Sequence, residues 1–430
     1  MNKHYATYSR SNDCFSSNCP DVFTRASGCH VTADDGREFI DFGMALRSVI
    51  LGYCYPKVDD AVKKAIDKGI SFTRSNPYEG ELKELLKAII PCCEEVKFGK
   101  NGSDATSAAV KLARAYTGKD IVLIPEECPF FSTWDWFIAD TPVSDGIPWD
   151  DSTRKYSYNK MTCCGVDLEK ILKEESHNIA AIILDPATVD ITKEKLQYIR
   201  GLCDKYGMVM ILDEVISGFR YSLNGVQGLY GVVPDLCTLG KAMGNGYSIS
   251  ALCGRKELFD LGLRDKGNVF LLSGTYFSET TGLAASIATI KELMEWHSFA
   301  SVGDRMKPSL ITAHDKLKAT GGAIIAFTRE YIKKNGLEEH VSIGGFPACP
   351  MMKWKDLRLK TIFDWKMIEN GILMPYIAPS LSHDANETYK TLDTIDDAMS
   401  FVKYALTGDL DKFIDANCRG HVERPIFRRC

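Results

Sequence analysis

The sequence lacks several features that would assign it to a class at once. No apolar run approaches the roughly 20 residues that span a bilayer, and the polar start at residues 1–12 has no apolar core of a signal peptide. The formal net charge is only -5, which gives no general reason to expect nucleic acid or an anionic membrane as a partner. We therefore expect a cytoplasmic protein that binds neither nucleic acid nor membrane.

Cysteine is abundant but lacks the spacings that would make it a framework. The 15 cysteines form no C-x-x-C motif, and their odd count in a long chain argues against a disulfide scaffold. Cys29 and His30 are adjacent candidate metal ligands, yet no further ligand stands at the usual spacing from them. We therefore expect reduced, mostly buried thiols and no metal site.

Repeats, low-complexity tracts and long linkers are absent, whereas the centre of the chain shows a clear alternation. Four short apolar runs bounded by turn or polar residues predict buried parallel strands at 121–124, 180–184, 208–212 and 236–239. Between the second and third runs, apolar residues recur at helical spacing in a segment that Thr192 opens and Gly207 closes. This alternation predicts an α/β fold with a mostly parallel central sheet flanked by helices.

The two chain ends differ in character from the centre. A chain of 430 residues exceeds the usual single domain. Phe39 to Phe42 are apolar enough for a strand, and the last part of the chain favours helices, including one near 396–406. We expect a large domain at 61–300 and a smaller α+β domain built from both ends, 1–60 and 301–430.

Two residues at the ends of predicted strands could carry chemistry. Asp213 ends the strand at 208–212, and Lys241 stands between the strand at 236–239 and a glycine-rich turn. The carboxyl ends of parallel strands face the ligand crevice, and a deprotonated lysine there can form an imine with an aldehyde. Taken singly, a loop-capping carboxylate and a surface lysine are the simpler interpretations.

A third candidate is the Gly102-Ser103 turn at the start of an amphipathic helix. Such a turn directs free backbone N–H groups, a hydroxyl and the positive end of the helix dipole at an anion such as phosphate. Ser103 could equally be a plain N-cap. No G-x-G-x-x-G follows an early strand, which argues against a nicotinamide-dependent oxidoreductase.

Taken together, in order and spacing, these segments resemble the class III aminotransferases of fold type I, and most closely their glutamate-1-semialdehyde 2,1-aminomutase branch. The resemblance extends over nearly the whole chain and is carried by residues 101–105, 111–118, 213–220, 230–235, 239–241 and 273–276. It implies pyridoxal 5'-phosphate as the cofactor. It also implies a homodimer, because the threonine of the family's glycine-threonine turn, here Thr275, reaches the phosphate of the neighbouring subunit.

The resemblance also implies a role for each matching residue. Lys241 would carry the cofactor as a Schiff base and move protons, and Asp213 would pair with the pyridine nitrogen. The remaining matches would bind the cofactor: Gly102 and Ser103 at its phosphate, Val215 on one ring face, Phe130 on the other, and Asp185 lining the pocket. An ordinary core position for Phe130 and a capping role for Asp185 are the alternatives.

The substrate segments favour one reaction within this resemblance. Residues 19–26 do not match the aminomutase pattern, and Tyr53 and Tyr55 replace its more usual histidines. We therefore expect an aminotransferase that moves an amino group from an amino-acid donor, glutamate on family grounds, to a small or sugar-like carbonyl substrate. The aminomutase is the first alternative, and a catalytically silent cofactor-binding relative is the second.

Overall fold

The computed structural model describes residues 12–125, 130–139, 141, 143–147, 153–156, 166–189, 191–269, 271–300 and 309–424. By its internal contacts the chain forms two compact units. The larger unit contains Pro56–Glu295, and the smaller unit combines Met1–Tyr55 with Trp296–Ile426. Within the residues that are described, no helix is both long and apolar enough to cross a membrane.

A seven-stranded sheet organises the larger unit, in the order β4-β10-β9-β8-β7-β5-β6. Strand β10 is antiparallel to both of its neighbours, whereas β9, β8, β7, β5 and β6 are mutually parallel. The strands are β4 (Glu95–Gly99), β5 (Ile121–Pro125), β6 (Thr153–Tyr156), β7 (Ile179–Leu184), β8 (Val209–Asp213), β9 (Leu236–Leu239) and β10 (Ser250–Gly254). All four strands predicted from apolar runs are confirmed.

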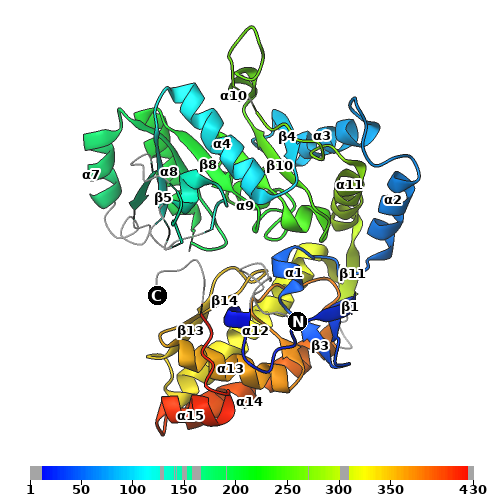
Figure 1. Cartoon of the computed structure of the whole chain (residues 1–430), viewed down its shortest axis with the longest axis vertical. Coiled ribbons are helices and arrows are strands. Elements are labelled where there is room, and N and C mark those ends of the chain that lie inside the picture. The colour runs from blue at the N-terminus through cyan, green and yellow to red at the C-terminus, as the bar shows by residue number, and fades with distance from the viewer. Residues whose placement is uncertain are drawn as a thin grey trace. The chain divides into compact units, whose positions relative to one another are not determined.

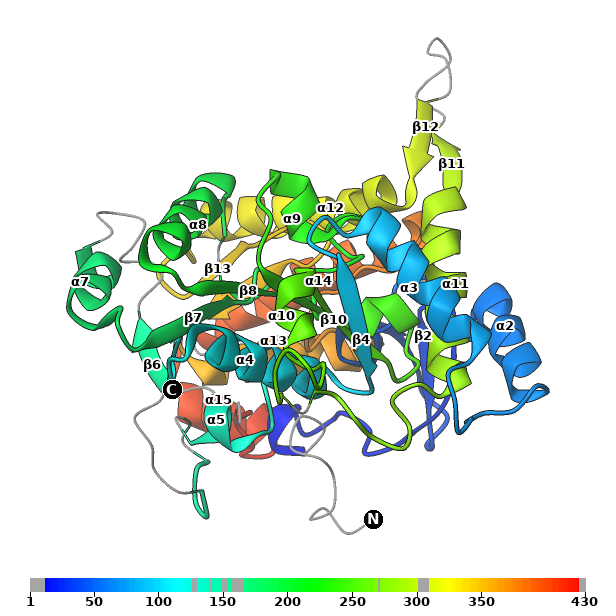
Figure 2. The ribbon, with the colours of Figure 1, turned by 90° about the horizontal axis from the view of Figure 1, so that it is seen from above.

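Helices cover both faces of this sheet. Helices α4 and α8 lie on opposite faces, as Figure 2 shows. The helices of the unit are α2 (Pro56–Ile66), α3 (Pro77–Ile89), α4 (Gly102–Thr117), α5 (Asp135–Ile138), α7 (Val166–Glu175), α8 (Lys193–Tyr206), α9 (Gly225–Tyr230), η4 (Lys241–Gly244), α10 (Lys256–Asp260) and α11 (Thr280–Glu295).

The predicted ends of α8 illustrate how local sequence fixes an element. The Thr192 hydroxyl accepts a hydrogen bond from the Lys195 N–H at 3.3 Å, which satisfies a donor that the first turn leaves open. Gly207 ends the helix in the left-handed conformation (φ 62°). Both predicted signals are confirmed, because capping depends on residues within one turn of each other.

The smaller unit has its own sheet (Figure 1) and its own hydrophobic core. Its main sheet has the order β1-β2-β3-β15, where β15 from the C-terminal segment pairs in parallel with β3 from the N-terminal segment. Its elements are η3 (Asn12–Cys14), β1 (Phe23–Ser27), β2 (His30–Ala33), β3 (Glu38–Asp41), α1 (Met44–Arg47), β11 (His297–Ala300), β12 (Ser309–Thr312), α12 (Ala313–Asn335), β13 (Val341–Gly344), β14 (Met351–Trp354), α13 (Leu357–Glu369), β15 (Ile372–Leu373), α14 (Ala385–Ala405) and α15 (Leu410–Asn417). The predicted strand at 39–42 and helix at 396–406 fall on β3 and α14.

Residues from both chain ends share the core of the smaller unit. Phe42 and Met44 from the N-terminal segment belong to one buried cluster with Ile362, Phe363 and Ile395. All five side chains are fully or almost fully buried. Burying each large apolar side chain contributes about 1.5–3 kcal/mol, so the two segments stabilise each other.

Candidate active site

The carboxyl ends of the parallel strands bring most of the predicted site residues to one edge of the sheet. Asp213 is the last residue of β8, Asp185 directly follows β7, and Lys241 stands two residues beyond β9. Gly102 opens α4, three residues after β4 ends. Ligands of open α/β sheets bind at this edge, because the strand-to-helix loops diverge there.

Asp213 is held rigidly at the end of its strand. Its side chain is 5% exposed, and its Oδ1 accepts hydrogen bonds from the Thr238 hydroxyl at 2.7 Å and the Val215 N–H at 3.1 Å. Thr238 lies directly opposite Asp213 in the parallel register of β8 and β9. The motif around Lys241 contains Thr238, but only the register between the strands shows that it positions the carboxylate.

The electrostatic state of Asp213 is unusual for an aspartate. Burial, and next the negative charge of Asp185, raise the pKa of Asp213 from 3.8 to about 7. The two hydrogen bonds and the positive charge of Lys241 act in the opposite direction. A positive charge placed next to Asp213 would therefore favour its ionised form.

Lys241 occupies a strained position next to this carboxylate. Its backbone adopts a left-handed φ of 43°, which is uncommon for a residue other than glycine. The side chain is partly exposed, and its charge lowers the pKa of Asp213. A non-glycine residue held in this region costs about 1–3 kcal/mol, and such strain is concentrated at functional sites.

The start of α4 and the Val215 side chain are in close contact. A Cβ atom added to Gly102 would lie 3.0 Å from Val215 Cγ1 and 3.1 Å from Cγ2, so a glycine lets the two segments meet. Asn101, rather than Ser103, is the N-cap residue of α4, which corrects the simpler interpretation of Ser103. The first turn of α4, where a helix leaves N–H groups for an anion, therefore begins beside Val215.

Phe130 lies in a segment that is attached to the first turns of α4. The Thr133 N–H donates to Ser103 Oγ at 3.2 Å, and the Thr106 hydroxyl donates to the Phe131 carbonyl at 2.8 Å. Phe130 itself is 43% exposed and makes an edge contact with Phe137 at 5.7 Å between ring centroids. Phe131, not Phe130, is the fully buried core residue, so the core interpretation of Phe130 is wrong.

Asp185 and Thr275, the remaining predicted residues, lie in different surroundings. The Asp185 carboxylate accepts hydrogen bonds from the Ala187 N–H at 2.9 Å and the Thr188 hydroxyl at 2.6 Å, so it caps its own turn. Its negative charge also raises the pKa of Asp213. Thr275 is exposed in the segment before α11. Its predicted role concerns a neighbouring subunit.

A buried carboxylate next to Asp213 was not predicted from the sequence. Glu214 is fully buried and accepts hydrogen bonds from the Val226 N–H at 2.5 Å and the Gln227 side chain at 3.0 Å, which attaches the loop after Asp213 to the start of α9. Burial raises the pKa of Glu214 to about 7. A Cβ on Gly225 would lie 2.5 Å from both carboxylate oxygens, so only glycine fits there.

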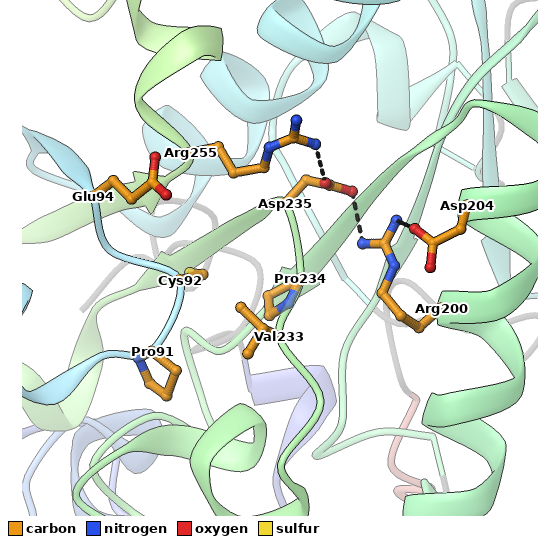
Figure 3. A pocket seen from close by; sticks show the side chains of 9 residues that line it. All are labelled: Pro91, Cys92, Glu94, Arg200, Asp204, Val233, Pro234, Asp235 and Arg255. Carbon is orange, nitrogen blue, oxygen red and sulfur yellow. Dashed lines mark hydrogen bonds and ion pairs between the residues drawn. The ribbon is translucent and has the colours of Figure 1, made fainter.

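A separate pocket of about 270 Å³ lies at the opposite ends of the strands. Asp235, just before β9, accepts hydrogen bonds from Arg200 at 2.8 Å and Arg255 at 2.7 Å (Figure 3). It also accepts one from the Met210 N–H at 2.7 Å, near the start of β8. Because Asp235 is neutralised by both arginines and bonded to the backbone, we assign it to structure and not to the candidate active site.

Known proteins with similar sequences and structures fit this geometry. Residues 14–123 and 135–324 match the family model of class III aminotransferases. The chain is 33% identical over 407 residues to the 3-aminobutyryl-CoA aminotransferase of Cloacimonas acidaminovorans, covering 90% of this chain and 91% of the relative. It is 35% identical over 290 residues to the glutamate-1-semialdehyde 2,1-aminomutase of Geotalea daltonii, covering 64% and 66% respectively.

Solved structures extend the similarity to the whole fold. The FumI protein of Sphingopyxis sp. MTA144, solved in its PLP internal aldimine form, aligns with a TM-score of 0.79 and 25% identity over 94% of each chain. An omega-transaminase from Sphaerobacter thermophilus aligns with a TM-score of 0.78 and 22% identity, over 91% of this chain and 93% of that chain. The second likeness is one of fold alone.

The fold and the strand-end site define an α/β transferase with a lysine beside a buried carboxylate. The chain belongs to the class III aminotransferases, because the family model matches most of it and a relative is 33% identical over nine tenths of it. These findings confirm the family resemblance and the fold-type I architecture that the sequence predicted. They also confirm the predicted enzyme class, which is transaminase or aminomutase.

Proposed function

We propose that this protein is a pyridoxal-phosphate-dependent aminotransferase in which Lys241 is the covalent attachment point of the cofactor. The observation that carries the proposal is the buried Asp213 carboxylate at the end of β8, held by the Thr238 hydroxyl on the same strand-end edge as Lys241. The protonated pyridine nitrogen of the cofactor would pair with this carboxylate and favour its ionised form. When bound, the cofactor provides an aldehyde for amines and a ring that accepts electrons from the carbon losing a proton.

The chain's own residues fit the two ends of such a cofactor. The N–H groups at the start of α4, with Gly102 and Ser103, suit its phosphate, because a helix N-terminus stabilises an anion. Val215 contacts Gly102 and would pack on one ring face, and Phe130, whose side chain is 43% exposed, would cover the other. Thr275 would contribute to the phosphate site of a partner subunit in a homodimer.

Lys241 performs the proton transfers in this proposal. When not bonded to the cofactor, its Nζ would take a proton from the substrate carbon that bears the amino group and would deliver it to the cofactor carbon on the other side of the nitrogen. This step uses the neutral amine of Lys241. Asp213 must stay ionised meanwhile, and Thr238 maintains its orientation through the 2.7 Å hydrogen bond.

Transfer between two molecules is the reaction we favour. The relative that aligns over most of this chain is an aminotransferase, whereas the aminomutase named above aligns over 64% of it. We propose glutamate as the donor and a small or sugar-like carbonyl compound as the acceptor. The intramolecular transfer of an aminomutase is the second candidate, supported by its 35% identity over the matched part.

The test is a visible absorption spectrum of the purified protein before and after addition of L-glutamate. We expect a band at about 420 nm that glutamate converts to one at about 330 nm, with release of 2-oxoglutarate. Lys241→Ala should lack the first band, whereas Lys256→Ala, which removes an exposed lysine of α10, should keep it.

Two results would contradict this proposal in different ways. No band after addition of pyridoxal phosphate would overturn the cofactor and the role of Lys241. A band that glutamate leaves unchanged, but that glutamate-1-semialdehyde converts without release of an oxo acid, would favour the aminomutase.

A further inference from the structure

Three potential metal ligands meet in the smaller unit, far from the candidate active site in sequence. Cys29 lies in the turn between β1 and β2, His30 is the first residue of β2, and Glu387 lies in the first turn of α14. Their ligand atoms, one from each residue, are all within 4.8 Å of one another. In the described part of the chain, they form the one group of at least three such residues that close together.

The spacing of these atoms is close to that of a tetrahedral zinc site. The Cys29 Sγ and His30 Nδ1 atoms are 3.8 Å apart. Zn–S bonds of about 2.3 Å and Zn–N or Zn–O bonds of about 2.0–2.2 Å at tetrahedral angles place ligand atoms about 3.4 to 3.6 Å apart. No pair of ligand atoms therefore needs to approach by more than about 1.4 Å, and the Cys29–His30 pair needs to approach by only a few tenths of an ångström.

The charges around the three residues favour a cation on balance. Glu387 and its neighbour Asp384 both place carboxylates here, and the negative charges of both act on Cys29. The charge of Asp41 also acts on Cys29. Lys316 is the opposing positive group, and its ammonium donates to a backbone carbonyl at 2.6 Å.

Accessibility also suits a bound ion. Cys29 is 1% exposed, whereas His30 and Glu387 are partly exposed, so the group is closed on the protein side and open on the other. Three protein ligands leave one tetrahedral position for water or another small ligand. The Cys29 thiol donates at present to the Ser382 carbonyl at 3.3 Å, and this proton is the one that a metal would replace.

We propose that Cys29, His30 and Glu387 bind one Zn²⁺ ion, or a similar divalent transition metal, and that this ion clips the N-terminal β1–β2 turn to helix α14. A thiolate and an imidazole select zinc over magnesium or calcium. Binding forms the Zn–S bond and releases the thiol proton to solvent. The two segments are separated by most of the chain, so only the folded state brings the three ligands together and zinc binding would stabilise that state.

The experiment measures zinc bound by the full-length holoenzyme. The protein is stripped with a chelator, loaded with Zn²⁺ and desalted, and its zinc content and thermal unfolding are then measured. We expect one zinc per chain and a higher unfolding temperature with zinc. Cys29→Ser and Glu387→Gln should each weaken binding at least about tenfold and remove the zinc-dependent stabilisation.

The second variant protects the test against misfolding. Glu387 Oε2 accepts from the Asp384 N–H at 3.2 Å to cap α14, and the carboxamide oxygen of Glu387→Gln can still accept that bond. Cys54→Ser is the matched control, because Cys54 is an exposed cysteine of the same unit outside the group.

Each outcome decides the proposal. Retention of zinc in Cys54→Ser with loss in both Cys29→Ser and Glu387→Gln supports it. Zinc content that is unchanged in those two variants, or that falls with Cys54→Ser instead, would assign the metal to other thiols and overturn the site. Failure of the wild-type protein to retain zinc overturns it directly.

Discussion

Replacing Asp213 by asparagine should stabilise the cofactor-free protein at high pH, although it removes a proposed catalytic group. Oδ1 of Asp213 accepts both of its hydrogen bonds, from Thr238 and Val215, and the amide oxygen of Asp213→Asn can keep both. The substitution therefore removes one buried charge and little else. Isosteric removal of an uncompensated buried charge relieves its desolvation cost.

The magnitude follows from the pKa of Asp213. Because folding raises this pKa from 3.8 to about 7, the folded state binds the proton more tightly than the unfolded state. Stability therefore falls as pH rises from about 4 to about 7, by at most about 4 kcal/mol, and stays reduced above that range. The advantage of Asp213→Asn should grow by about 2 to 3 kcal/mol between about pH 5 and about pH 8.5.

Denaturant unfolding of the cofactor-free proteins at these two pH values measures the effect. Asp67→Asn, which removes an exposed carboxylate of the same unit, controls for the change in net charge. Pyridoxal phosphate should reverse the order at high pH, because its protonated nitrogen pairs with Asp213 but not with the amide. An advantage of Asp213→Asn that is equal at both pH values would refute the reasoning about burial.

Substitutions of Gly225 and Gly102 give two further predictions, with Gly231 as a control for the first. Gly225→Ala should lower the free energy of unfolding by about 2–4 kcal/mol, because its Cβ would lie 2.5 Å from the Glu214 carboxylate oxygens at a φ of 68°. Gly231→Ala, at a φ of 67° in open space, should cost only about 1 kcal/mol, and equal losses in thermal or denaturant unfolding would count against the steric argument. Gly102→Ala should push Val215 away and weaken pyridoxal-phosphate binding about tenfold, as measured by titration of the cofactor-free protein. The free energy of unfolding should change by less than about 1 kcal/mol. An unchanged affinity would show that this contact does not belong to the cofactor site.

Much of the fold could be predicted because its signals are local. The strands appeared as short apolar runs, since β7 and β8 are buried along their whole length, and Thr192 and Gly207 marked α8 through contacts within one helical turn. The lysine and aspartate at the strand ends were also visible, because the carboxyl end of a parallel strand is known once the strand is known. For these features the sequence by itself was sufficient.

Other features were decided only by tertiary structure. Thr238 supports Asp213 through the register of two strands, and Glu214 reaches α9 across a loop, neither of which follows from spacing along the chain. The clearest case is Glu387, which completes a group with Cys29 that looked isolated in the sequence. Proximity between distant residues depends on how buried faces pack and on the backbone path between them, and local propensity carries no information about either.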